Sequence, residues 1–152
     1  VPDFLGKRES IETLLDSNVE VFAQNLETVK RLTHQVRDHR AGYEQTLEVL
    51  AYAKTYSPKT ISKTSLMLGL GESEDELLES FNDIRSAGVD VLTLGQYMRP
   101  TINHLPVEKW YSPAEFQYMK KLALDIGFKE VASGPLVRSS YRADKIAHLI
   151  KG

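Results

Sequence analysis

The 152-residue sequence contains no cysteine. This absence excludes disulfide bonds, thiolate nucleophiles and cysteine-ligated zinc or iron–sulfur sites from anything the polypeptide does alone. No apolar run approaches the ~18 residues that a membrane span requires, and no charged-then-apolar signal peptide opens the chain. The charge is nearly balanced, with 19 Lys+Arg against 21 Asp+Glu, so it predicts neither a nucleic-acid nor a membrane partner.

The remaining composition is that of a folded domain, with 41% hydrophobic and 26% charged residues, and a chain of this length can bury one core. The histidines share neither helical i, i+4 spacing nor one element, which argues against a histidine metal site: His34, His39, His104 and His148. Ser139 and Ser140 lack the glycine pattern of a nucleophile elbow, which argues against a hydrolase.

Apolar runs of strand length alternate with helical stripes along the chain. Strands are predicted at 19–23, 61–70, 89–94 and 128–132, and helices at 9–16, from 43 to just before Pro58, from 73 to 88, from 112 to 127 and in a short tail. Ser73 with Glu76 and Ser112 with Glu115 have the spacing of capping boxes. The alternation predicts right-handed parallel crossovers, so the fold class is α/β.

Two features of the chain's organisation stand out. Residue 1 is valine, and the stub Val1-Pro2-Asp3-Phe4 reads like the end of a strand, so we expect a fragment of a longer protein. The connection from Asn25 to Arg40 is long and polar. Because ordinary loops in compact domains are shorter, this connection is expected to be functional or mobile.

Polar side chains follow the predicted strands where each ends, which is the edge at which parallel α/β proteins bind ligands. This group comprises Gln24-Asn25-Leu26-Glu27, Gly69-Leu70-Gly71-Glu72 after a strand containing Lys63, Gly95-Gln96-Tyr97-Met98-Arg99-Pro100, and Ser133-Gly134-Pro135 followed by Val137 to Arg142. Carboxamides, a carboxylate, a lysine and two arginines on one edge suit a ligand with several polar groups, such as an amino acid or a nucleoside.

Each of these groups also has a structural interpretation. Asn25 and Glu27 could cap their loop, and Lys63 could extend its ammonium group to the rim of the sheet. Gly69-Leu70-Gly71 lacks the third glycine of a dinucleotide fingerprint, so a turn is the better interpretation. The serines at 139 and 140 could form a hydrogen-bonded turn. The remaining basic residues could form a solvated face or dock a carrier protein: Lys30, Arg31, Arg37 and Arg40.

In combination these strings are specific. They are Val1-Pro2-Asp3-Phe4, Asn25-Leu26-Glu27-Thr28-Val29, Lys63-Thr64 with Leu66-Met67-Leu68-Gly69-Leu70-Gly71-Glu72, Leu94-Gly95-Gln96-Tyr97, His104-Leu105-Pro106, and Ala132-Ser133-Gly134-Pro135-Leu136-Val137-Arg138-Ser139-Ser140-Tyr141. Together and in this order they closely resemble the lipoyl synthase family of radical S-adenosylmethionine enzymes. The resemblance covers essentially the whole chain, which looks like the carboxyl-terminal half of such an enzyme.

The resemblance implies the carboxyl-terminal part of a partial (β/α) TIM-like barrel, with half-barrel βα units over 1–134 and a cluster-ligand segment over 135–152. It implies two 4Fe-4S clusters and S-adenosylmethionine, which together insert sulfur at carbons 6 and 8 of a protein-bound octanoyl chain. The implied partners are the missing cysteine-bearing amino-terminal half and an octanoylated lipoyl carrier domain, either the E2 component of a 2-oxoacid dehydrogenase or the glycine cleavage H protein. The implied location is the cytoplasm, or the mitochondrial matrix in a eukaryote.

Carried over residue by residue, the resemblance implies S-adenosylmethionine contacts from Asn25, Glu27, Lys63, Gln96 and Arg138. It also implies that Ser139 or Ser140 ligates the auxiliary cluster, where an oxygen donor fits iron less well than thiolate and is more easily released.

The sequence departs from the family pattern in three respects. Gln24 stands where a histidine is more usual, and Ile102-Asn103 replaces a commonly basic pair, which leaves carrier docking near 99–104 in question. The cysteine triads that hold both clusters are missing, so we expect the chain alone to bind no cluster stably and to be inactive. The exposed edge and open face of a half barrel predict poor solubility or self-association.

Two other functions compete with this interpretation. One is a non-catalytic half-barrel module that binds a nucleoside or a carrier protein. The other is a barrel enzyme such as an aldolase, in which Lys63 would form a Schiff base with a carbonyl substrate.

Overall fold

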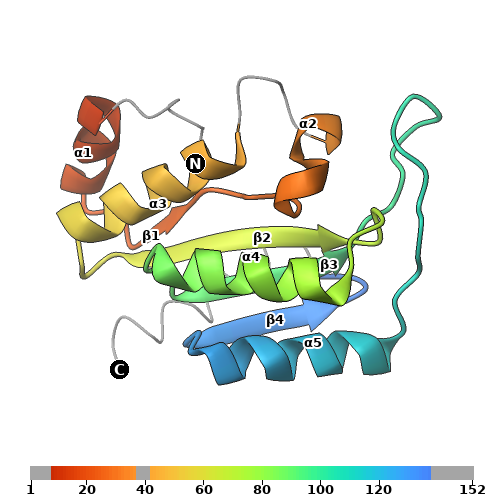
Figure 1. Cartoon of the computed structure of the whole chain (residues 1–152). Coiled ribbons are helices and arrows are strands. Elements are labelled where there is room, and N and C mark those ends of the chain that lie inside the picture. The colour runs from red at the N-terminus through yellow and green to blue at the C-terminus, as the bar shows by residue number, and fades with distance from the viewer. Residues whose placement is uncertain (1–7, 37–41, 138–152) are drawn as a thin grey trace.

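The computed structural model describes residues 8–36 and 42–137. Its elements are α1 (Arg8–Asp16), β1 (Val21–Ala23), the 3-10 helix η1 (Lys30–Leu32), α2 (Thr33–Val36), α3 (Tyr43–Tyr56), β2 (Ile61–Leu68), α4 (Glu74–Ser86), β3 (Val91–Gln96), α5 (Pro113–Ile126) and β4 (Glu130–Gly134). The strands form one parallel sheet in the order β1-β2-β3-β4, and helices cover it (Figure 1). The α/β class and the parallel crossovers are confirmed, and the arrangement is that of a partial TIM-like barrel.

The two predicted capping boxes set the starts of α4 and α5. Ser73 Oγ accepts from the Glu76 amide and Glu76 Oε1 accepts from the Ser73 amide, at 3.2 and 2.9 Å. Ser112 and Glu115 repeat the pair at 3.1 and 3.0 Å. Gly127 ends α5 at φ +122°, a backbone conformation that suits glycine.

The two faces of the sheet have different surroundings because side chains alternate along each strand. On one face, Leu66 and Leu68 of β2 and Leu92 and Leu94 of β3 are at most 1% exposed and join the core. The opposite face carries a separate apolar cluster at the amino ends of the strands, made by Val21, Ile61 and Val91. Beyond this cluster, the same face of β2 and β3 carries polar side chains. The fold therefore places polar groups on the face of the sheet opposite the helix-covered core.

The strand boundaries differ from those predicted for the second half of the chain. The predicted strand 89–94 lies at Val91–Gln96, and 128–132 lies at Glu130–Gly134. Asp90 lies just before β3 and links the segments at both boundaries, because its amide donates to the Ser62 carbonyl and its carbonyl accepts from the Lys129 amide. The long connection after Asn25 also contains η1 and α2, because its buried Val29 and Leu32 attach it to the core.

The predicted strand at Val1-Pro2-Asp3-Phe4 and the short helical tail lie outside the described residues. Within residues 8–36 and 42–137, no helix is both long and apolar enough to span a membrane.

Asp90 joins α3, β2 and β4 at the amino end of the sheet. Its side chain, 2% exposed, accepts from Lys54 Nζ at 2.7 Å and from the Ser62 amide at 3.0 Å, with Lys129 Nζ at 3.6 Å. Its backbone amide donates to the Ser62 carbonyl, and its carbonyl accepts from the Lys129 amide. Burial alone would raise the pKa of Asp90, but the Lys54 and Ser62 hydrogen bonds and the two ammonium charges hold it below its ordinary value.

We expect Asp90→Asn to lower the free energy of unfolding by about 2–3 kcal/mol at pH 7, because it leaves Lys54 facing a neutral amide in a buried site. Since the folded pKa lies below the unfolded one, this contribution is complete above the unfolded value and is lost as pH falls through the folded value. We would measure the free energy of unfolding of both proteins with urea from pH 7 to pH 3. The difference between them should be constant down to about pH 4 and should shrink below it. Asp125→Asn, at an exposed position of α5, is the control and should change little. A difference that persists undiminished at pH 3 would contradict the assignment.

Candidate functional site

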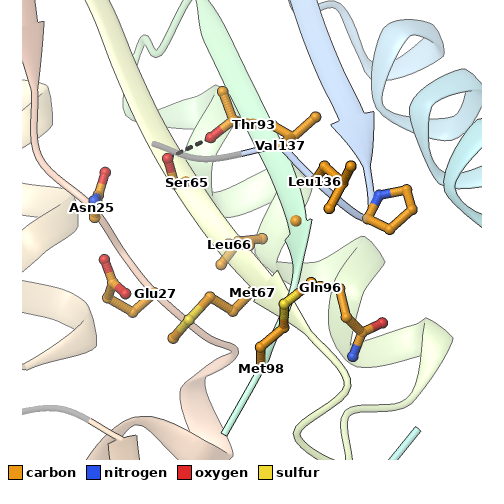
Figure 2. A pocket seen from close by; sticks show the side chains of 12 residues that line it. Asn25, Glu27, Ser65, Leu66, Met67, Thr93, Gln96, Met98, Leu136 and Val137 are labelled. Carbon is orange, nitrogen blue, oxygen red and sulfur yellow. Dashed lines mark hydrogen bonds between the residues drawn. The ribbon is translucent and has the colours of Figure 1, made fainter. Parts of the chain in front are cut away.

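A cleft of about 360 Å³ opens at the carboxyl end of the sheet (Figure 2). Its lining residues come from the segment after β1, from β2, from β3 and the loop after it, and from the segment after β4: Asn25, Glu27, Ser65, Leu66, Met67, Thr93, Gly95, Gln96, Met98, Pro135, Leu136 and Val137. The predicted residues Asn25, Glu27 and Gln96 are therefore brought together. Arg138, Ser139 and Ser140 lie outside the described residues.

The backbone at Glu27 is strained. Glu27 has φ +76°, and the Thr28 amide donates to the Leu26 carbonyl at 3.0 Å, which defines a γ-turn of the rarer hand. The turn is held to β2 on both sides, since the Glu27 amide donates to Ser65 O at 3.0 Å and the Met67 amide donates to Glu27 O at 2.8 Å. Strain of this kind persists only where its surroundings enforce it, and it is common at ligand sites.

Thr64 fixes the segment that carries Asn25. Its hydroxyl donates to Gln24 O at 2.7 Å and accepts from the Leu26 amide at 3.0 Å, so it spans Asn25 on both sides. Thr64 is fully buried. Sequence reasoning missed this role, because the partners of Thr64, Gln24 and Leu26, lie on another segment about 40 residues earlier in the chain.

The floor of the cleft carries two hydroxyls, Ser65 on β2 and Thr93 on β3. They are register partners and hydrogen-bond to each other (Figure 2). Gly95, one pair further along β3, has no side chain, and a Cβ there would lie 2.3 Å from the Val137 carbonyl oxygen. Glycine therefore allows the segment after β4 to cross the floor and complete the cleft.

Lys63 lies on β2 two residues before Ser65 and is not among the cleft-lining residues. It is only 4% exposed, and burial lowers the pKa of its ammonium group. The interpretation in which Lys63 extends to the rim of the sheet is therefore wrong.

Gln96 lines the cleft and also contacts the loop that follows β3. Its amide donates to the Tyr97 and Lys109 carbonyls at 3.0 and 2.9 Å, and its oxygen accepts from the Tyr111 amide at 2.9 Å. The carboxamide thus holds the loop 97–111 onto the sheet. Its ligand contact stays a prediction.

The Gly69-Leu70-Gly71 segment is a turn, as predicted. The Glu72 carboxylate accepts from the Gly69 and Leu70 amides at 2.9 and 3.0 Å and from the Tyr111 hydroxyl at 2.8 Å. The amides that would hold a phosphate in a glycine-rich loop are therefore occupied by the chain's own carboxylate.

Arg31 is more than part of a solvated face. Its guanidinium donates to both Glu76 oxygens, at 2.7 and 3.0 Å, and to Gly71 O at 2.8 Å. Its hydrogen bonds, with that from the Ser73 amide, lower the pKa of Glu76 to about 2. Arg31 thus ties the connection after β1 to the start of α4. Arg37 and Arg40 lie outside the described residues.

Cluster ligands are lacking in the described part of the chain. The sequence has no cysteine, and residues 8–36 and 42–137 bring together no three His, Asp or Glu side chains that could hold a metal ion. The residues present do not fit an iron–sulfur cluster by themselves. They do fit a polar organic ligand, because the cleft offers a carboxamide and a carboxylate on one wall.

The parallel sheet and the cleft at its carboxyl end define an α/β protein of the barrel type. No family model matches the chain. Curated relatives do match: the chain is 61% identical to the lipoyl synthase of Ectopseudomonas mendocina, 59% to that of Legionella pneumophila and 59% to that of Thermus thermophilus. Each match covers 95% of this chain but only 41%, 44% and 45% of the relative. The chain is therefore a homologue of the lipoyl synthases that spans less than half of their length.

Alanine substitutions at Gly69 and Gly71 allow steric clash to be distinguished from backbone strain. The two glycines have nearly the same φ, +110° and +108°, so the strain should be similar at both. A Cβ at Gly69 would lie 2.4 Å from Gln96 Nε2 and 2.5 Å from Lys109 O, whereas at Gly71 the nearest atom, Glu108 Cγ, lies at 3.6 Å. We expect Gly71→Ala to cost about 1–2 kcal/mol and Gly69→Ala about 2 kcal/mol more. Urea unfolding gives both values, and hydrogen exchange at the Tyr111 amide should accelerate only in Gly69→Ala. Equal losses of stability in the two variants would contradict the close contact of Gly69 with Gln96 and Lys109.

The strain at Glu27 is testable by two variants that both lack the carboxylate. Glycine adopts φ +76° without the Cβ penalty, so Glu27→Gly should be about 1 kcal/mol more stable than Glu27→Ala, despite the greater flexibility of glycine in the unfolded chain. Thermal and urea unfolding of the two proteins provide the comparison. If alanine is as stable as glycine at this position, the turn is not strained.

Proposed function

We propose that the chain forms the part of a lipoyl synthase that holds S-adenosylmethionine and the substrate, and that it acts only together with the remaining part of the enzyme. The observation that carries this proposal is the 61% identity to a lipoyl synthase over a chain whose polar cleft lies at the carboxyl end of a parallel sheet. In the complete enzyme the reaction would replace hydrogen by sulfur at carbons 6 and 8 of an octanoyl chain.

The polar wall of the cleft suits the adenosyl ligand. The Glu27 carboxylate can accept from ribose hydroxyls and attract an ammonium group, and the Asn25 amide can both donate and accept. Thr64 and the turn at Glu27 hold the backbone of these two residues in place, so the backbone needs little further ordering when a ligand binds. When bound in enzymes of this class, S-adenosylmethionine supplies a 5′-deoxyadenosyl radical.

The iron–sulfur clusters need ligands from elsewhere, because this chain has no cysteine. We therefore assign the thiolates of both 4Fe-4S clusters to the part of the relatives that the chain does not match. Arg138 and one of Ser139 and Ser140 remain the candidates from this chain, the serine as a ligand of the auxiliary cluster. With lipoyl synthesis as the function, an octanoylated E2 component or H protein is the partner and the cytoplasm or mitochondrial matrix the location.

A chimera tests this function. Joining the chain to the part of the Ectopseudomonas mendocina relative that it does not match should restore clusters and, with S-adenosylmethionine and a reductant, convert an octanoylated H protein to the lipoyl form. Mass spectrometry of the H protein measures the exchange of two hydrogens for two sulfurs. The chain alone, reconstituted anaerobically with iron and sulfide, should show no stable iron–sulfur absorbance and no product.

Glu27→Gln in the chimera should lower kcat/KM for S-adenosylmethionine by roughly tenfold or more, because it removes the only carboxylate among the described lining residues. Glu130→Gln is the matched control, since Glu130 is an exposed carboxylate at the opposite, amino end of β4, and it should leave the rate unchanged. A chimera that binds S-adenosylhomocysteine and holds clusters but makes no lipoyl group would favour the non-catalytic binding module.

A further inference from the structure

The loop 97–111 stands out from the carboxyl end of the sheet, between β3 and α5 (Figure 1). It reaches the length at which connections without helix or strand are uncommon in compact domains and are usually functional. Both of its ends are fixed to the sheet edge, since the Tyr97 amide donates to Leu68 O at 2.8 Å and the Tyr111 hydroxyl donates to Glu72 at 2.8 Å. The loop is therefore an ordered projection beside the cleft.

The tip of this loop is a hydrogen-bonded turn from Thr101 to His104. The His104 amide donates to Thr101 O at 3.0 Å, and the Asn103 amide donates to the Thr101 hydroxyl at 3.2 Å. Arg99 holds the turn closed, because its Nε donates to His104 O at 2.9 Å and its Nη2 donates to Ile102 O at 2.6 Å. The conformation of the tip is thus set before a partner binds, which lowers the entropic cost of binding.

The side chain that the tip presents to solvent is apolar. Ile102 is 82% exposed, although turn positions of this kind are usually occupied by small or polar residues. The nearest charged side chain in the sequence, that of Arg99, donates to carbonyl groups of the turn itself. The tip therefore offers a rigid apolar contact.

This contact lies outside the cleft but on the same loop as one of its walls. Met98 lines the cleft and Ile102 does not. A small molecule in the cleft therefore leaves Ile102 uncovered, whereas a protein that inserts a modified side chain into the cleft would also cover the surface around it. Met98, Ile102 and Trp110 of this loop are three of the seven large hydrophobic side chains that are exposed in the described part of the chain. Such gathering beside a site is typical of a protein-binding surface.

We infer that Ile102, at the tip of the loop 97–111, is a docking contact for the folded protein domain that carries the octanoyl group. This inference rests on the proposed function and adds to it the surface that the carrier domain contacts outside the cleft. A convex apolar tip fits a shallow apolar depression on that domain. Because Arg99 is used within the turn, binding should depend on apolar burial and change little with salt.

Binding of the full 152-residue chain to H protein tests this surface, with calorimetry as the measurement and both octanoylated and unmodified H protein as probes. Ile102→Gln should raise the Kd roughly tenfold for both probes, because the tip contacts the protein and not the acyl group. Leu124→Gln is the matched control and should leave the Kd unchanged. Leu124 is also an exposed apolar side chain, but it lies in the last turn of α5, which leads to the amino end of β4.

Arg99→Lys distinguishes the ordered turn from the charge. Lysine keeps the positive charge but lacks the planar fork that reaches two carbonyl groups. The Kd should therefore rise several-fold at both about 50 mM and about 500 mM NaCl. Thermal unfolding verifies that each variant is folded. An unchanged Kd in Arg99→Lys, or a wild-type Kd that rises steeply with salt, would show that charge and not the ordered apolar tip carries the contact.

Other outcomes would also overturn the docking contact. These are no binding of either form of H protein to the chain, and an Ile102→Gln effect that is confined to the octanoylated form. The second result would mean that the tip contacts the acyl group.

The chimera separates this inference from the proposed function. There, Ile102→Gln should raise KM for octanoylated H protein roughly tenfold and leave kcat unchanged, as well as the conversion of a short peptide that contains octanoyl-lysine. An unchanged KM, or an equal loss with the peptide, would overturn the docking contact and leave lipoyl synthesis standing. Ile102-dependent binding of H protein by the chain, together with an inactive chimera, would retain the docking contact and reject the synthase.

Discussion

The geometry of the sheet and of the cleft depends on hydrogen bonds to the buried peptide groups of β2. This buried strand pairs with β3 from Lys63 to Leu68, but β1 is only three residues long and ends at Ala23. The next residues therefore take over as partners, with the Gln24 amide bonding Lys63 O and Glu27 bonding Ser65 and Met67. Because unpaired buried peptide groups are costly, the chain accepts a strained turn to keep these bonds. The same bonds place Asn25 and Glu27 at the cleft.

The two faces of the sheet divide stability from ligand binding. Helix-facing leucines of β2 and β3 form the core, and the residues between them form the floor of the cleft. Asp90 holds the amino ends of the strands together, while the Gln96 and Glu72 contacts hold the loop at their carboxyl ends. These two sets of contacts hold both ends of the sheet whose carboxyl end carries the cleft. The segment after β1 gives the cleft its charged residue, Glu27, and the segment after β4 gives it Pro135, Leu136 and Val137.

Local signals in the sequence predicted the elements well, because capping boxes and apolar periodicity act within a few residues. They placed β3 two residues early, and they did not reveal the role of Asp90, because that role depends on Lys54 and Ser62, which are distant in sequence. The same limit applies to the site. Strand ends predicted that Asn25, Glu27 and Gln96 would lie together, but not the positive φ of Glu27, the anchoring by Thr64 or the burial of Lys63. Each of these depends on a neighbouring strand.

The Glu72 carboxylate, which accepts hydrogen bonds from the amides of the glycine turn, has a consequence for phosphate binding. Glu72 supplies to Gly69 and Leu70 the negative charge that a nucleotide would otherwise bring. A second anion at the same amides would meet repulsion and find no vacant donor. These two amides therefore offer no site for a phosphate group of ATP or of another phosphorylated adenosine. Within the proposed function, the turn would therefore serve to attach the loop at Tyr111 to the end of β2, and not to bind a nucleotide.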